Sequence, residues 1–133
     1  MRIRGEKMVK KITNKDEKFY QYMGKFFGSR LVQSLTNDRI YDDDNKEWYI
    51  YKKDDVVKAF VSIHKDVIKN IYTTNAKYLE EILENVKSEN NITYSIVTNY
   101  YSEIYEKCGF KINKSGSYKN FVMIYTDAEE ASA

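Results

Sequence analysis

The chain has 133 residues, a formal net charge of +2 and a hydrophobic share of 42%. This length and apolar content suit a single domain with its own core and exclude a disordered chain. The small net charge gives no field that would favour nucleic acid or an anionic membrane as a partner, and no apolar run is long enough to span a bilayer. A single cysteine favours a reducing, cytoplasmic setting.

The first third of the chain predicts one strand and one helix. The opening MRIRGEKMVKK is basic but lacks the apolar run of a signal peptide, so we interpret it as a solvated end. Residues 9–13 predict a short strand. Asn14 or Asp16 can cap a helix that runs to about residue 35, and two glycines, Gly24 and Gly28, favour a break in it. The apolar side of this helix holds Phe19, Met23, Phe26, Phe27 and Leu31.

An acidic loop and three strands follow. Residues 38–46 are polar and predict an exposed loop, whose run Asp42-Asp43-Asp44 either is simply solvated or attracts a cationic substrate such as a polyamine, an aminoglycoside or a lysine side chain. Strand propensity and short turn signals then predict an antiparallel meander of three strands. Its strands are residues 47–52, 56–64 and 67–73.

The second half alternates helices and strands. Thr74 or Asn75 can cap a helix to about residue 88, with an apolar stripe at Ala76, Leu79, Ile82, Leu83 and Val86. A strand at 92–97 leads into a helix at 99–108, which places Tyr101, Ile104, Tyr105 and Cys108 on one face. Gly109 sits where a helix end favours a left-handed residue. Residues 110–113 and 118–126 predict two strands joined by a hairpin turn at 114–117, and the acidic tail 127–133 predicts disorder.

The segment Tyr105-Glu106-Lys107-Cys108-Gly109-Phe110 resembles the YEKxGF ending of the penultimate helix in the GNAT superfamily of acyl-CoA N-acyltransferases. The predicted element order, β, α, β-β-β, α, β, α, β-β, is also the order of that fold. The resemblance implies one α/β (α+β) domain over residues 1–126, with a mixed, mostly antiparallel sheet flanked by helices. The sheet is split between its fourth and fifth strands, where acyl-CoA enters. The fifth strand should run parallel to the fourth, with the helices at 74–88 and 99–108 on opposite faces or flanking the split.

The sequence departs from the family at the cofactor pyrophosphate. GNAT enzymes usually carry R/Q-x-x-G-x-G/A after the fourth strand, whose backbone amides hold the pyrophosphate. Here the strand ends at Ile71-Tyr72-Thr73 and the helix begins almost at once, with no glycine or arginine between them. The amides of Asn75, Ala76, Lys77 and Tyr78, with the Lys77 charge, remain as possible phosphate contacts, and the backbone of 69–73 as the contact for pantetheine.

By the same resemblance, Tyr105 would protonate the departing CoA thiolate; the alternative is a core tyrosine on an amphipathic helix. Asn99 resembles the family's asparagine at the end of the fifth strand, and the alternative is a helix N-cap. The general base would be Glu47 or His64, with Asp66 close behind, although all three also suit a solvated surface. Cys108 has no histidine nearby in sequence and faces the core, so we do not expect a nucleophile there.

Two functions remain open on the sequence. One is transfer of an acetyl group from acetyl-CoA to an amine of a small molecule or a protein. The other is a non-catalytic GNAT-fold protein that binds or inhibits a partner protein, which the shortened pyrophosphate loop favours. We expect no metal, because one histidine and one cysteine at unrelated positions give no ligand spacing. A monomer and a homodimer both fit.

Overall fold

The computed structural model describes residues 8–36, 38–42, 45–113 and 120–126. The predicted turn at 114–117, the predicted tail and two of the three loop aspartates therefore lie outside the described residues. The elements follow the predicted order. They are β1 (Val9–Ile12), α1 (Phe19–Met23), η1 (Gly24–Phe26), α2 (Arg30–Thr36), β2 (Glu47–Lys53), β3 (Val56–His64), β4 (Val67–Thr73), α3 (Ala76–Glu89), β5 (Ser95–Thr98), η2 (Asn99–Tyr101), α4 (Ser102–Lys107), β6 (Lys111–Asn113) and β7 (Phe121–Tyr125).

The predicted N-terminal helix is broken, as its glycines suggest. Gly28 has a φ of 78°, a left-handed conformation that ends the first helical segment. The predicted cap is wrong: the helix starts at Phe19, because Asp16 instead closes its own turn by accepting the Thr13 amide at 2.7 Å. The predicted inward side chain Leu31 is exposed, and Val32 is buried in its place. The break resets the phase of the second helix.

The three-strand meander is confirmed. β3 pairs antiparallel with β2 and β4, with Tyr49 opposite Val61 and Val61 opposite Ile71. Both connecting turns have two successive residues with positive φ, which matches the right-handed twist of the flanking strands. These pairs are Asp54-Asp55 and Lys65-Asp66.

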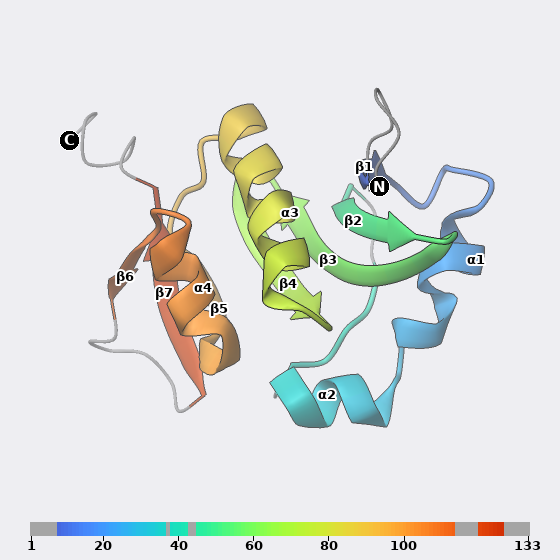
Figure 1. The fold of residues 1–133 in the computed structure, drawn as a ribbon, viewed down its shortest axis with the longest axis horizontal. Helices are drawn as coiled ribbons and strands as arrows, with labels where there is room; N and C mark the ends of the chain where they lie inside the picture. Colours follow the sequence, from blue (N-terminus) through green and yellow to red (C-terminus); the bar gives the residue numbers. More distant parts are fainter. Residues whose placement is uncertain (1–7, 37, 43–44, 114–119, 127–133) are drawn as a thin grey trace.

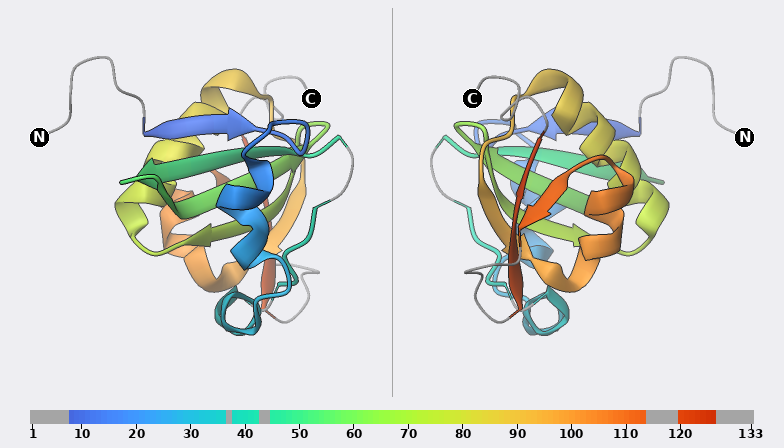
Figure 2. Two further views of the ribbon diagram at one scale, coloured as in Figure 1. Left: turned by 90° about the vertical axis from the view of Figure 1, so that its right-hand side faces the viewer. Right: turned by 90° about the vertical axis from the view of Figure 1, so that its left-hand side faces the viewer.

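Helices cover both faces of this sheet, so its strands are apolar on both sides. α3 and α4 lie on one face, where α3 packs on the meander and α4 on the last three strands, and α1 lies across the other face (Figures 1 and 2). α3 and α4 thus flank the split, as predicted. Among the described residues, no helix is long and apolar enough to cross a membrane, and no group of three or more His, Cys, Asp or Glu side chains is arranged to hold a metal ion.

The predicted split between the fourth and fifth strands is present, and β5 runs parallel to β4 as predicted, but the two strands form no hydrogen-bonded ladder. β1 to β4 form one antiparallel sheet, and β5, β7 and β6 form a second, in that order. β4 and β5 run side by side in the same direction without ladder pairing. The Ser95 hydroxyl joins them at one end by accepting the Ile68 amide at 2.9 Å. A bulge in β4 opposite Ser62 and Ile63 places Lys69 out of register, which interrupts the regular edge a parallel ladder needs.

The YEKCGF segment ends α4 as its glycine predicts. The Phe110 amide donates to the Tyr105 carbonyl and the Gly109 amide to the Glu106 carbonyl, each at 3.0 Å. This pair of bonds is the Schellman arrangement, and Gly109 takes the left-handed φ of 89° that it requires. The helix end fixes the rotation of α4, and with it the direction in which Tyr105 points.

Candidate functional site

Backbone groups of β4 and β5 face each other across the split. The Thr74 amide donates to Lys58 of β3, so the Thr73 carbonyl of the same planar peptide points the other way, into the split. Ile71, two residues earlier on the strand, faces the same side. On the opposite wall the Asn99 amide donates to Asn120, so the Thr98 carbonyl also points into the split.

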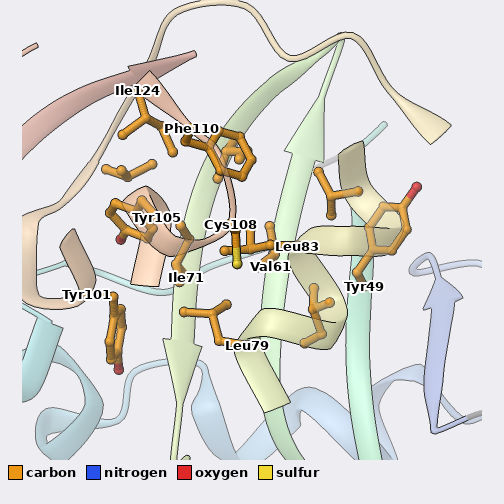
Figure 3. Packing of buried hydrophobic residues seen from close by; sticks show 14 of the residues in the cluster. Tyr49, Val61, Ile71, Leu79, Leu83, Tyr101, Tyr105, Cys108, Phe110 and Ile124 are labelled. Carbon is orange, nitrogen blue, oxygen red and sulfur yellow. The ribbon is translucent and has the colours of Figure 1, made fainter. Parts of the chain in front are cut away.

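The Tyr101 hydroxyl occupies the β4 wall. It accepts the Thr73 amide at 3.2 Å and donates to the Thr73 carbonyl at 3.4 Å. Its ring is buried and lies beside β4, on the same side of that strand as Tyr105 (Figure 3). Burial raises the pKa of Tyr101 to about 12. One side chain therefore satisfies both backbone groups of Thr73.

The Tyr105 hydroxyl occupies the β5 wall. It donates to the Thr98 carbonyl at 2.7 Å, and the residue is 0% exposed. Burial raises the pKa of Tyr105 well above its ordinary value. The geometry does not support the predicted general acid, because the proton is already engaged and a phenol of such high pKa is a poor donor to a thiolate of pKa about 8.5. The Tyr105 hydroxyl thus faces the split, but its hydrogen bond to the Thr98 carbonyl gives it a structural role there.

Between these tyrosine contacts and the Ser95 contact lies Ile71, which is 1% exposed. Its amide and carbonyl point away from β3, toward the split, and β5 forms no ladder with this edge of β4. A strand edge that no neighbouring strand covers with a ladder is a place where an extended ligand carrying amides can add. Of the predicted pantetheine contacts at 69–73, only the backbone groups of Ile71 and Thr73 face the split. The side chain of Tyr72, between them, packs in the core on the α1 side of the sheet.

The predicted phosphate contacts at the start of α3 are mostly satisfied within the chain. The Asn75 amide donates to Thr73 Oγ1 at 3.0 Å, the Lys77 amide to Asn75 Oδ1 at 2.9 Å and the Tyr78 amide to the Asn75 carbonyl at 3.1 Å. Asn75 is therefore the helix cap, and of these four amides only that of Ala76 has no partner among the described residues. Residues Asn75 to Tyr78 do not form the predicted anion cradle.

A cavity of about 670 Å³ opens beside Tyr101. It lies between the first turn of α3 and the start of α4, and Asn99 and Ala76 line it as a cofactor site would require. Its charged side chains are Glu103 and Glu106, which repel phosphate. The predicted N-cap role of Asn99 is wrong, because Thr98 Oγ1 caps η2 by accepting the Tyr100 amide at 3.3 Å.

A second groove of about 500 Å³ runs between α3 and α4, and Lys77 lies here rather than at a phosphate site. Three glutamates, Glu80, Glu81 and Glu84, outnumber the two lysines, Lys77 and Lys107. Cys108 also lines this groove, and burial raises the pKa of its thiol to about 11, so it is a poor nucleophile. Neither cavity has the positive charge that a pyrophosphate favours.

The structure does not bring the predicted bases to the split. Glu47 lies at the start of β2, with β3 and β4 between it and β5, and pairs with Lys11 at 3.8 Å. His64 lies at the far end of β3, where its Nδ1 is 3.2 Å from the Asn45 carbonyl. The third candidate, Asp66, is an exposed turn residue. None of these contacts Tyr105.

A buried polar cluster that the sequence analysis missed lies under β4. Asn70 donates to Asp38 Oδ2 at 3.1 Å and accepts from Lys46 Nζ at 3.0 Å and from Ser62 Oγ at 2.8 Å. Burial raises the pKa of the Asp38 carboxyl, and Asp38 is close enough to Tyr105 to contribute to its raised pKa. The sequence did carry a signal for this cluster, because Ser62 and Asn70 are polar residues within otherwise apolar strands.

Asp42, the described residue of the aspartate run in the acidic loop, is hydrogen-bonded to the rest of the fold. Asp42 accepts the Trp48 indole N–H at 3.0 Å and the Asn14 amide group at 3.0 Å. It is therefore partly committed to the fold, and the solvated-loop interpretation of Asp42 is wrong. Asp43 and Asp44, the rest of the predicted cation-attracting run, lie outside the described residues.

No protein-family model matches the sequence, and no curated protein matches it either. Solved structures do match. Escherichia coli ElaA superposes with a TM-score of 0.58 at 12% identity over 89% of this chain and 98% of its own. A Bacteroides thetaiotaomicron protein assigned to the GNAT family of acetyltransferases gives 0.56 at 17% identity over 92% of each chain. A Bacillus subtilis acetyltransferase in complex with CoA gives 0.51 at 14% identity over 89% of this chain and 96% of its own.

Proposed function

We propose that this chain, which has the GNAT fold, is an N-acyltransferase that takes an acetyl group from acetyl-CoA and passes it to an amine. The observation that carries the proposal is the edge of β4 at the split, where the amide and carbonyl of buried Ile71 face the gap and β5 forms no ladder with them. The pantetheine arm of CoA carries two secondary amides and can pair there as an extra strand would. The CoA complex of the Bacillus subtilis protein is consistent with this choice of ligand.

When bound, acetyl-CoA supplies an activated acyl group as a thioester, and the chain must position the acceptor and take its proton. For the proton we propose Asp38 in place of Glu47 and His64. Its carboxyl is held by Asn70, the β4 residue next to Ile71, and its pKa is raised by burial, which makes it a stronger base than an ordinary aspartate. A carboxylate there also suits a cationic amine of a small molecule or a protein. We keep the cytoplasm as the proposed location.

The proposed affinity is weak. Three of the four amides at the start of α3 are already used, and the cavity at the mouth of the split carries Glu103 and Glu106. Contacts between this chain and the pyrophosphate thus contribute little binding free energy, and most of it must come from the pantetheine arm. We expect a Kd of about 100 μM or weaker.

A non-catalytic GNAT-fold binding protein is the second candidate. It is favoured by one observation: the predicted acid Tyr105 donates to Thr98, and neither predicted base, Glu47 nor His64, lies near it. Such a protein would act through contacts with a partner protein and would not need the cofactor.

The test combines a calorimetric titration with CoA and an assay of CoA thiol release from acetyl-CoA. The release assay is run with a polyamine, an aminoglycoside and a lysine-containing peptide, because a cationic acceptor is expected. We expect weak saturable binding of CoA and thiol release that depends on one class of amine. Adenosine 3′,5′-bisphosphate, which lacks pantetheine, is the control and should bind more weakly than CoA. Absence of any CoA binding at millimolar concentration would favour the binding protein.

A further inference from the structure

The contact between Tyr101 and Thr73 has the geometry of a ligand contact. A single hydroxyl accepts the Thr73 amide and donates to the Thr73 carbonyl, two bonds that a C=O group and an N–H group of an added strand would otherwise make. The same edge of β4 presents its next donor and acceptor at Ile71, where β5 forms no ladder with it. The hydroxyl comes from η2, across the split, and not from the sheet itself.

We infer that the Tyr101 hydroxyl competes with the ligand for Thr73, so that an extended chain carrying secondary amides, such as pantetheine, must displace it to pair with β4. This rests on the proposed function, because it concerns the same split. Tyr101 is thus an affinity-determining residue, and the split is closed when no ligand is present.

The surroundings of Tyr101 allow this displacement. The residue borders the cavity of about 670 Å³ at the mouth of the split, which gives the side chain space to move and the ligand a way in. It lies in a single-turn 3₁₀ helix, whose hydrogen bonds are weaker than those of an α-helix. Both of its bonds to Thr73 are longer than 3 Å, so each is easily exchanged for a ligand amide.

The experiment compares wild type with Tyr101→Phe, which keeps the buried ring and removes the hydroxyl. The variant leaves the Thr73 amide and carbonyl without their partner, so a ligand that pairs with them gains more on binding. We expect CoA and free pantetheine each to bind the variant about three- to tenfold more tightly than they bind wild type, the value of one neutral hydrogen bond. Calorimetry measures both affinities.

Tyr100→Phe is the matched control. Tyr100 is the adjacent residue, borders the same cavity and is 58% exposed, but its hydroxyl makes no contact with Thr73. The affinity of Tyr100→Phe for CoA and for free pantetheine should equal that of wild type. Amide hydrogen exchange gives a second readout that needs no ligand: the Thr73 amide should exchange faster in Tyr101→Phe than in wild type, and CoA should restore its protection.

The outcomes separate the two proposals. Equal CoA affinity of wild type and Tyr101→Phe overturns the inference and leaves the proposed function standing. Tighter binding of both probes by Tyr101→Phe, with no amine-dependent thiol release from either form, supports the inference and contradicts the proposed function. Failure of both probes to bind either form overturns both.

Discussion

Replacing Tyr105 by alanine is expected to lower the free energy of unfolding by about 3–5 kcal/mol, the usual cost of removing a large buried ring. The residue is fully buried, and its ring packs in the core shared by α3, α4 and both sheets. The change also leaves the Thr98 carbonyl without the hydroxyl that satisfies it. Urea denaturation measures the loss.

Tyr105→Phe separates the structural role from the predicted catalytic one. It keeps the ring, so the expected loss is only about 1–2 kcal/mol, from the unsatisfied carbonyl. Turnover in the acetyl-transfer assay should stay within a few-fold of wild type. A general acid would behave differently, with turnover falling about a hundredfold or more. Such a fall, with stability unchanged, would contradict the assignment of Tyr105 to the fold.

Replacing Asn70 by alanine is expected to cost about 3 kcal/mol or more, because it removes hydrogen bonds from buried and charged groups at once. Asn70 is 3% exposed and bonds to Asp38, Lys46 and Ser62. Lys46 is also 3% exposed, so its ammonium cannot recover the lost bond from bulk water. The measurement is again urea denaturation.

Asn85→Ala is the control for that prediction. Its side chain donates to the Glu81 carbonyl at 2.9 Å on a partly exposed turn of α3, so its stability should stay within about 0.5 kcal/mol of wild type. If Asn70→Ala were no more harmful than Asn85→Ala, the polar cluster under β4 would not be the rigid unit described above, and Asp38 would lose its support as a base.

Much of the fold could be predicted because it depends on local patterns. The strands of the meander are separated by two-residue turns, which fix their antiparallel register. The helical spacing of Tyr101, Tyr105 and Cys108 correctly predicts their burial, and Gly109 correctly predicts the end of α4. In each case the determining residues lie within a few positions of one another.

The site could not be predicted in the same way, because its contacts join distant parts of the chain. Asp38 and Asn70 are 32 residues apart, and Thr73 and Tyr101 are 28 apart. No local sequence pattern predicts that the Tyr101 hydroxyl hydrogen-bonds to Thr73 while the Tyr105 hydroxyl hydrogen-bonds to Thr98. The missing parallel ladder has the same origin, since it depends on a bulge in β4 that no local residue pattern indicates.

The proposed function requires that the ligand pair with the edge of β4 inside the split. Backbone amide NMR during a titration with CoA tests it most directly. We expect the largest shifts at the amides of Ile71, Thr73 and Tyr101, with small changes along the groove between α3 and α4. Saturable shifts confined to Lys77, Glu81 and Glu84, with Ile71 and Thr73 unmoved, would contradict it.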